Sequence, residues 1–304
     1  MVVNVLVVGA GVIGSVYGAH LAVAGHNVSV LDHGPRTGYI AVNGLQVRDI
    51  LDGQLTNTSV EVVNDVARGS YDLVLVAVRR DQLAAAARLI QSAGQPTVLF
   101  FGNNPAGHAT INGQVPGRVY LGFPGIGGTM TNGEARYVRI PQQPTALQST
   151  DDPRLAEVES ALRRRGFAVQ RVADMDGWLA YHAAFVACVA AALYHCDTDP
   201  VELAGDRPTL RLMCRAITEG FTALRAQGVG GLARNLAILH HPLLRPVAVA
   251  YWARTMRSPM GEMCFAAHAR HAQPEMRALC QDTLARLTHP TASMHIRQLL
   301  QNVA

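Results

Sequence analysis

Residues 5–14 read Val5-Leu6-Val7-Val8-Gly9-Ala10-Gly11-Val12-Ile13-Gly14, and this stretch decides how the rest of the chain folds. An apolar run of strand length leads into a glycine turn, and the segment from Ser15 to Ala24 is typical of a helix. In such a unit the first glycine bends the chain, the second admits a pyrophosphate, and the third lets the helix pack on the strand. Residues 9–14 therefore predict a dinucleotide-binding turn with the phosphates at the helix N-terminus.

The residues after the second predicted strand bear on the choice of cofactor. That strand, residues 27–31, ends on Asp32. An acid about 20 residues beyond the glycine turn binds the ribose hydroxyls of NAD(H) and repels the extra phosphate of NADP(H), so Asp32 favours NAD(H). His33 and Arg36 follow in the adjoining loop. Arg36 is the nearest guanidinium that could bind that phosphate, which keeps NADP(H) as the alternative.

The composition is that of a chain with two globular domains. The sequence has 304 residues, of which 49% are hydrophobic and 16% are charged. We expect no membrane span, because no apolar run looks long enough, and no signal peptide, because the first strand occupies the N-terminus. The 5 cysteines are scattered without zinc or redox spacing, so a reduced, cytoplasmic protein without a metal site is expected.

The charged residues exclude two further classes of function. The net charge of +4 is dispersed apart from Arg163-Arg164-Arg165, so no nucleic-acid partner is expected. All 26 basic residues are arginines, because the chain contains no lysine. Neither a Schiff base nor a lysine general acid can therefore form part of the chemistry.

The order of predicted elements divides the chain in two. The first part alternates strands and helices, with a buried strand at 71–78 and another at 97–101, and with a small antiparallel excursion formed by 45–48 and 60–63. From Asp174 onward the pattern is helical. We predict an α/β protein: a Rossmann-type doubly wound sheet in a dinucleotide-binding domain over 1–172, then an all-helical domain over 173–304 for substrate binding and dimerisation. Because parallel strands bind ligands at their carboxyl ends, Val8, Val78 and Phe101 should end at one crevice.

In this order of motifs the chain resembles the ketopantoate reductases, which have a helical domain like that of 6-phosphogluconate dehydrogenase. The resemblance rests on the N-terminal glycine turn, on the step Val76-x-Val78-Arg79-x-x-Gln82, and on the loop Asn104-Pro105-Ala106-Gly107. It implies that Val78 and Arg79 adjoin the cofactor, with Arg79 in place of a family lysine. It also implies that Asn104 lies beside the nicotinamide.

The chain departs from the family where the family binds substrate. The family motif W-x-K-x-x-x-N-x-x-x-N supplies a general-acid lysine and two substrate-binding asparagines. Here Trp178 is retained, but Ala180 replaces the lysine, and Ala184 and Cys188 replace the asparagines. Reduction of ketopantoate by the family mechanism is therefore not expected, and another proton donor is needed.

Histidine is the side chain that ionises nearest to neutral pH, so His182 is the first candidate for that donor, with Tyr181 as the alternative. The periodicity of a helix turns His182 about 200° away from Ala180, which is an argument against it. A histidine in an alanine-rich helix is also often a packed core residue. Weaker candidates for substrate contact are Glu219, His268 and Glu275; Arg245, Arg254 and Arg257 are candidates for binding a substrate carboxylate.

These observations predict an NAD(P)-dependent oxidoreductase that transfers hydride between nicotinamide and a small carbonyl or hydroxy compound, such as a 2-keto acid. Two alternatives remain open: an enzyme that reduces imines or oxidises alcohols in secondary metabolism, and a dinucleotide-binding sensor without catalysis. A homodimer is expected, because the helical half has more apolar helix faces than one small domain can bury.

Overall fold

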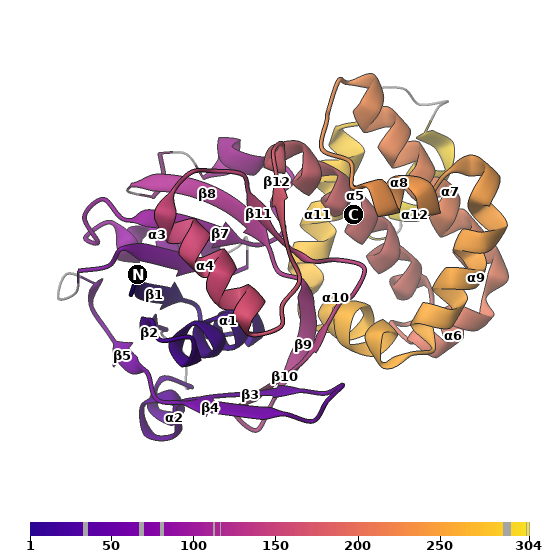
Figure 1. Ribbon diagram of the computed structural model, residues 1–304. Coiled ribbons are helices and arrows are strands. Elements are labelled where there is room, and N and C mark those ends of the chain that lie inside the picture. The colour runs from indigo at the N-terminus through magenta and orange to yellow at the C-terminus, as the bar shows by residue number, and fades with distance from the viewer. Residues whose placement is uncertain are drawn as a thin grey trace. The chain divides into compact units, whose positions relative to one another are not determined.

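A computed structural model describes residues 1–32, 36–66, 70–79, 82–111, 113–115, 117–287, 293–301 and 303 (Figure 1). The chain forms two compact units. The first comprises residues 1–102 and 108–173, and the second comprises residues 103–107 and 174–304. The predicted loop at 103–107 therefore clusters with the helical unit, although it follows a strand of the first unit.

The larger sheet of the first unit has eight strands among the described residues, in the order β12-β11-β8-β7-β6-β1-β2-β5. Neighbouring strands are parallel, except β11 and β8. Strand β1 is central: Val7 pairs with Val30 of β2 and with Leu75 of β6. Because both its neighbours are strands and its side chains are buried, β1 is the apolar run that the sequence predicts. The strands are β1 (Asn4–Val8), β2 (Asn27–Leu31), β5 (Glu61–Val63), β6 (Leu73–Val76), β7 (Thr97–Phe101), β8 (Arg118–Phe123), β11 (Thr145–Gln148) and β12 (Val169–Val172).

A second sheet of four strands corrects one prediction. Its order is β4-β3-β10-β9, with β3 (Leu45–Asp49), β4 (Leu55–Thr58), β9 (Ile126–Thr131) and β10 (Glu134–Arg139). Strand β3 pairs with β4, whereas residues 61–63 form β5 and pair with β2 in the larger sheet. The excursion predicted from 45–48 and 60–63 is therefore wrong. The Ser29 hydroxyl donates a hydrogen bond to the Glu61 carboxylate at 3.0 Å, a contact that the parallel pairing of β2 with β5 makes.

Helix α1 (Val12–Val23) joins the two sheets of this unit. It packs against β1 and β2 of the larger sheet and against β3, β4, β9 and β10 of the smaller one. This position explains why α1 is apolar on most of its surface rather than on one stripe. The other helices of the unit are α2 (Arg36–Asn43), α3 (Leu83–Ile90) and α4 (Pro153–Arg164), and a 3-10 turn, η3, spans Gly107–Thr110.

The second unit is helical, which together with the parallel sheet confirms the predicted fold class. Its core is the long helix α5 (Met175–His195), which packs against α7 (Arg207–Ala226), α11 (Gln273–Ala285) and α12 (Met294–Leu300). Alanines along α5, such as Ala187 and Ala191, are buried at these contacts and let the neighbouring helices approach closely. The remaining elements are α6 (Pro200–Gly205), α8 (Arg234–Leu239), η4 (Pro242–Leu244), α9 (Arg245–Met256), a π-helix η5 (Gly261–Ala266) and α10 (Ala267–His271).

Helix α5 corrects a second expectation. It has 21 residues, and its most apolar window of 18 residues has a mean hydropathy of 1.5, so by length and composition it could cross a membrane, although no apolar run of that length was expected. However, 89% of its most apolar window is buried inside the protein. Its apolar surface is therefore used by the helix contacts of this unit.

Candidate functional site

The glycine turn after β1 has the backbone that a dinucleotide requires. Gly9 has φ +93°, and a Cβ there would lie 2.7 Å from Val78 Cγ1 and 2.9 Å from the Ala77 carbonyl oxygen. A Cβ at Gly14 would overlap the Gly9 carbonyl oxygen, because α1 starts close against the turn. At Gly11, in contrast, a Cβ would meet no protein atom within 4 Å. The first and third glycines are thus required by the protein itself, and the second faces open space.

The open space at Gly11 fits the pyrophosphate of a dinucleotide. Gly11 is the N-cap of α1, and the first turn of this helix contains no acidic residue. The amide groups at a helix N-terminus attract an anion, and an acid there would oppose it. The three glycines therefore fit the pyrophosphate of a dinucleotide, which the backbone of residues 9–14 could hold.

Asp32 and Arg36 lie on the same side of this turn. Asp32 follows β2 and is half-buried, and its carbonyl oxygen accepts a hydrogen bond from the Thr37 hydroxyl at 3.3 Å. The Arg36 guanidinium donates to the Ala10 carbonyl oxygen and, at 3.2 Å, to that of Gly133. Burial lowers the pKa of Arg36, while the charge of Asp32 opposes that shift. The guanidinium therefore rests on the glycine turn beside the acid; His33 lies outside the described residues.

The residues after β6 are the next neighbours of the glycine turn. Val78 is half-buried against Gly9, whereas Arg79 is exposed. The backbone N–H of Arg79 donates to the Gln82 side chain at 3.2 Å, and the N–H of Gln82 donates to the Arg79 carbonyl oxygen at 2.9 Å. These two bonds fix the backbone of Arg79 just beyond the carboxyl end of β6.

Two hydrogen bonds join the loop 103–107 to the helices of this unit, and a third closes the loop on itself. The Asn103 side-chain amide donates to the Glu275 carboxylate at 3.0 Å, and both side chains are buried. The Asn104 amide donates to the Gly107 carbonyl oxygen at 2.6 Å and so closes the turn. The Arg286 guanidinium donates to the Pro105 carbonyl oxygen at 2.8 Å. Glu275, a candidate for substrate contact, is thus an anchor of this loop.

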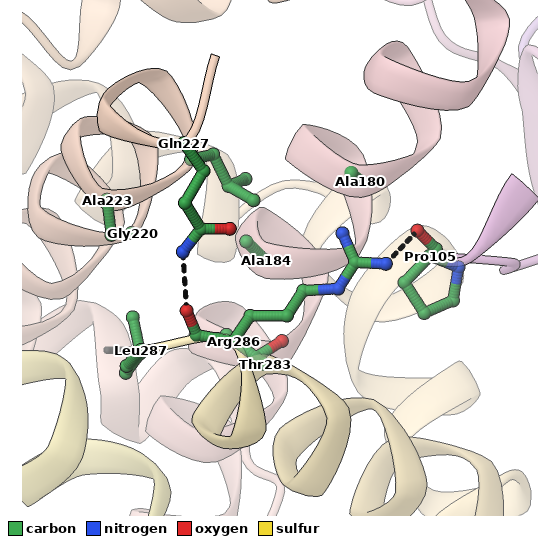
Figure 2. A pocket seen from close by; sticks show the side chains of 10 residues that line it. Pro105, Ala180, Ala184, Gly220, Ala223, Gln227, Thr283, Arg286 and Leu287 are labelled. Carbon is green, nitrogen blue, oxygen red and sulfur yellow. Dashed lines mark hydrogen bonds between the residues drawn. The ribbon is translucent and has the colours of Figure 1, made fainter. Parts of the chain in front are cut away.

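A small cavity of about 10 Å³, with room for about one water molecule, adjoins this loop inside the helical unit (Figure 2). Most of its wall is apolar, and the polar lining comes from Gln227, Thr283 and Arg286. Gln227 and Arg286 are the C-caps of α7 and α11, and the Gln227 amide donates to the Arg286 carbonyl oxygen at 2.6 Å. Figure 2 shows the Arg286 side chain reaching across the cavity toward Pro105. The apolar part is lined by Pro105, Ala180, Ala184, Gly220, Ala223, Leu224 and Leu287.

Two of these lining residues are the positions at which the sequence loses the family's polar groups. Ala180 stands in place of the lysine and Ala184 in place of the first asparagine, and both line the cavity. These two positions of the motif therefore line the cavity, but they no longer carry the ammonium and amide groups that the family has there. Cys188, one turn further along α5, is fully buried, and burial raises its pKa well above the usual value of a thiol.

The predicted proton donors do not line the cavity. His182 lies on another face of α5, where its ring stacks on Trp178 at 4.9 Å between centroids, and its side chain is 4% exposed. Burial lowers the pKa of His182 to about 3, so the ring is neutral near pH 7. The Tyr181 hydroxyl donates to the Val229 carbonyl oxygen at 2.9 Å. Both side chains are packed inside the helical unit and neither lines this cavity, and their role as proton donors stays a prediction.

The other candidates from the helical half also lie away from the cavity lining. The Glu219 carboxylate accepts hydrogen bonds from the His295 ring and from the Ile296 backbone N–H, so it holds the start of α12. His268 is half-buried in α10. Arg254 is exposed on α9, and Arg257 donates to the Ala253 carbonyl oxygen. None of these residues, nor Arg245, is among those that line this cavity.

Arg286, Gln227 and Thr283 were not predicted as site residues. The sequence indicates a helical region from Asp174 onward, but sequence spacing does not reveal which helix ends meet. The one signal was the missing lysine, which implies that an arginine must supply any cation of the site. Within the described residues, no group of three or more histidine, cysteine or acidic side chains could hold a metal ion.

Comparisons with known proteins agree with this architecture. Residues 5–150 match the family model "Ketopantoate reductase PanE/ApbA", and no curated protein matches the chain. A putative ketopantoate reductase from Ralstonia solanacearum MolK2 has 18% identity and a TM-score of 0.76, over 100% of this chain and 97% of that one. A PanE/ApbA family ketopantoate reductase from Ralstonia eutropha JMP134 has 21% identity and a TM-score of 0.73, over 98% and 96%.

A third solved structure is a D-mandelate dehydrogenase with NADH and anilino(oxo)acetate, at 16% identity and a TM-score of 0.74, over 98% of this chain and 97% of that one. At these identities the solved structures show the fold. The family match shows more for the first half of the chain, because it covers the glycine turn and the strands that surround it. The match of residues 5–150 to the ketopantoate reductase PanE/ApbA family model agrees with the resemblance seen in the sequence, and the whole chain has the fold of these reductases.

Proposed function

We propose that this protein is an NAD(H)-dependent oxidoreductase that transfers hydride between nicotinamide and a small 2-oxo or 2-hydroxy acid. The observation that carries the proposal is the glycine turn, in which Gly9 and Gly14 are required by the protein and Gly11 leaves room for a pyrophosphate. The fold shared with a D-mandelate dehydrogenase that holds NADH and anilino(oxo)acetate supports the choice of cofactor and substrate class.

Different residues of the first unit contact different parts of the cofactor in this proposal. The backbone of residues 9–14 binds the pyrophosphate, and Asp32 binds the ribose hydroxyls. Arg36 lies against the Ala10 carbonyl oxygen, so it supports the turn beside Asp32. NAD(H) follows from Asp32, whose charge opposes a 2′-phosphate; NADP(H) remains the alternative through Arg36. Val78, Arg79 and Asn104 complete the cofactor-binding set.

The reduced nicotinamide, when bound, supplies a hydride to the carbonyl carbon, and the carbonyl oxygen takes up a proton. No lysine exists in the chain to deliver that proton. The described polar groups that line the cavity are a hydroxyl, an amide and a guanidinium, and none of them releases a proton readily near neutral pH. The proton therefore comes from water admitted with the substrate.

Ketopantoate itself is not the substrate we propose. Ala180 and Ala184 leave the cavity without the ammonium and the amide that the resemblance assigns to those positions. When a site lacks the polar groups that bind a substrate, kcat/KM for that substrate falls by a large factor.

The proposal is tested by the consumption of NADH and NADPH in the presence of a panel of 2-oxo acids, with ketopantoate and simple ketones included. We expect NADH-dependent turnover of a short-chain 2-oxo acid that exceeds turnover of ketopantoate. Cofactor binding without turnover of any compound would favour the sensor function, which the mostly apolar cavity also fits. Turnover of imines or oxidation of alcohols alone would favour the enzymes of secondary metabolism.

We further propose a cytoplasmic homodimer. All 5 cysteines are free thiols, which suits a reducing compartment. The segment from α8 to α9 carries exposed apolar side chains: Ile238 at 53%, Leu243 at 84% and Val247 at 58% of full exposure. Exposed apolar patches of this kind are typical of protein contacts, and a second copy is the partner most often found. Light scattering that gives the mass of one chain would contradict the dimer.

A further inference from the structure

We propose that the turn of the β9–β10 hairpin belongs to the cofactor site, and that it holds the Ala10-Gly11 peptide in position through Arg36. The inference deepens the proposed function and rests on it, because it requires a dinucleotide at the glycine turn. It gives the smaller sheet of the first unit a role in binding. It also makes Arg36 a positioning residue and not a ligand of a 2′-phosphate.

The hairpin turn itself is held in one shape. Strands β9 and β10 are antiparallel, with Thr131 opposite Glu134. The two residues between them, Asn132 and Gly133, have φ +49° and +85°, as a tight Asn-Gly hairpin turn requires. The Arg48 guanidinium donates two hydrogen bonds to the Glu134 carboxylate, at 2.8 and 2.9 Å, and so joins the hairpin to β3 next to the turn. The Gly133 carbonyl oxygen therefore has a defined position.

Helix α2 contacts this turn through Arg36 and Tyr39, which lie three residues apart and so share one face of the helix. The Arg36 guanidinium donates to the Gly133 carbonyl oxygen at 3.2 Å. The Tyr39 ring lies against Gly133, because a Cβ there would be only 2.5 Å from Tyr39 Cζ. The Tyr39 hydroxyl donates to the Gln46 side chain at 2.7 Å, which restrains the ring. Position 133 therefore requires glycine both for its φ and for its contact with Tyr39.

Arg36 connects this turn to the glycine turn. Its Nη1 donates to the Ala10 carbonyl oxygen, to which the Ser15 hydroxyl also donates, at 3.0 Å. A trans peptide directs its C=O and its N–H to opposite sides. Holding the Ala10 carbonyl therefore also sets the direction of the Gly11 N–H, which is one of the backbone groups that the proposed function gives to the pyrophosphate.

The same contacts bear on the choice of cofactor. A guanidinium has five N–H donors, four of them on its two terminal nitrogens. In Arg36 these two nitrogens make four contacts, with Ala10, with Gly133 and, twice at 3.5 Å, with the Ser15 hydroxyl oxygen, and Nε is buried. A phosphate is bound through a free edge of the planar fork. Arg36 would have to release the glycine turn to bind a 2′-phosphate, so its placement favours NAD(H), as Asp32 does.

A phosphate-binding role for Arg36 makes a different prediction. If Arg36 bound the 2′-phosphate, its loss would weaken the binding of NADPH and leave that of NADH unchanged. If it positions the glycine turn, its loss weakens both alike, because both nucleotides contain the pyrophosphate. A change at Gly133 should then have the same effect, although this residue belongs to the smaller sheet.

The experiment compares Arg36→Met, Arg36→Lys and Gly133→Ala with Gly53→Ala. Gly53 is a matched control: it also has a left-handed φ, +72°, it lies between β3 and β4 of the same sheet, and a Cβ there would meet no atom within 4 Å. Fluorescence titration gives the affinities for NADH and NADPH. Arg36→Met and Gly133→Ala should each lower both affinities about 10-fold, as the loss of a charged hydrogen bond does, and keep their ratio within about 3-fold. Arg36→Lys should recover part of the loss, and Gly53→Ala should show none.

The double variant Arg36→Met/Gly133→Ala tests whether the two residues act through each other. Changes at residues in one network of contacts are not additive. We therefore expect the affinity of the double variant for NADH to lie within about 3-fold of that of the weaker single variant. Losses that multiply would show that the two residues act independently, and would contradict the proposal.

A measurement without nucleotide separates this inference from the proposed function. Glycine labelled with ¹⁵N gives a Gly11 amide signal in the cofactor-free protein, which is assigned by its absence in Gly11→Ala. The signal should shift in Arg36→Met and in Gly133→Ala, and stay in place in Gly53→Ala. If it does so while the unchanged protein binds neither nucleotide, the role of the hairpin turn stands and the proposed function fails. An unshifted Gly11 signal in both variants, or a loss in Arg36→Met of NADPH binding alone, would overturn the inference.

Discussion

The rings of His182 and Trp178 stack with an interplanar angle of 7° on a face of α5 that does not line the cavity. This pairing makes His182 part of the packing of the helical unit. We therefore expect His182→Gln to keep kcat/KM with NADH and 2-oxobutanoate within about 3-fold, while the loss of an aromatic pair lowers the free energy of unfolding by about 1 kcal/mol. Urea unfolding and steady-state kinetics measure the two effects. A variant that folds normally but loses turnover completely would restore His182 as the proton donor.

Acid should destabilise this protein through its buried histidines. Burial lowers the pKa of His182 to about 3 and that of His20 and His240 to about 4, each from an ordinary value of 6.5. A group whose pKa is lowered on folding binds its proton in the unfolded chain first, so the stability falls as the pH drops below 6.5 toward the folded pKa. Each histidine contributes a slope of up to about 1.4 kcal/mol per pH unit in that window.

The pH dependence is measured as the urea midpoint between pH 7 and pH 4.5, with the two units followed by separate probes where they unfold separately. In His182→Gln, the unfolding free energy of the helical unit should depend less steeply on pH, because one fewer proton is taken up on unfolding. The pH dependence of the other unit should not change. An unaltered slope in that variant would show that His182 is protonated in the folded protein.

Cofactor choice should depend on Asp32. We predict that Asp32→Ala weakens NADH binding and strengthens NADPH binding, because it removes the partner of the ribose hydroxyls and the charge that opposes a 2′-phosphate. The ratio of the two affinities should shift by about 10-fold or more, the worth of one charged hydrogen bond. Fluorescence titration with each nucleotide gives both affinities, and Asp65→Ala, on the loop after β5, serves as the control. No change in the ratio would show that Arg36, not Asp32, determines the preference.

The loop 103–107 should depend on the contact between Asn103 and Glu275. Glu275→Ala leaves the buried Asn103 amide without its acceptor, which costs about 1–3 kcal/mol of unfolding free energy. Glu275→Gln keeps an acceptor oxygen and should cost less than half as much. Both values come from urea unfolding of the helical unit followed by tryptophan fluorescence. Equal stability of the two variants would contradict the anchoring role.

The sequence predicted the first unit better than the second for a physical reason. The conformation of the glycine turn and of the strands around it is determined locally. For example, Gly14 must be a glycine because a Cβ there would overlap the Gly9 carbonyl oxygen of the same βαβ unit. The edge strand at 61–63 was assigned to the wrong sheet, because which strands pair is decided across the whole sheet.

The site in the helical unit could be predicted only by what it lacks. The sequence shows that position 180 lacks the family's lysine. In the structure Ala180 lines a cavity, which agrees with the substrate contact that the resemblance implies for this position. Arg286 could not be found, since it meets Ala180 only because the ends of α7 and α11 converge beside α5. His182 was predicted as a proton donor because it lies two residues from Ala180 in the sequence, although helical periodicity places the two side chains on different faces of the helix.

The central claim, that a nicotinamide dinucleotide binds at the turn after β1, is tested most directly by fluorescence titration of the protein and of Gly11→Ala with NADH. A Cβ at Gly11 meets no protein atom within 4 Å, and the residue has φ −63°, so this variant should melt at the same temperature as the unchanged protein. It should nevertheless lose NADH binding, because the new methyl group occupies the path of the pyrophosphate. Saturable binding by the unchanged protein and its loss in a fully folded variant is the predicted result. Equal binding by both proteins, or binding by neither, would contradict the claim.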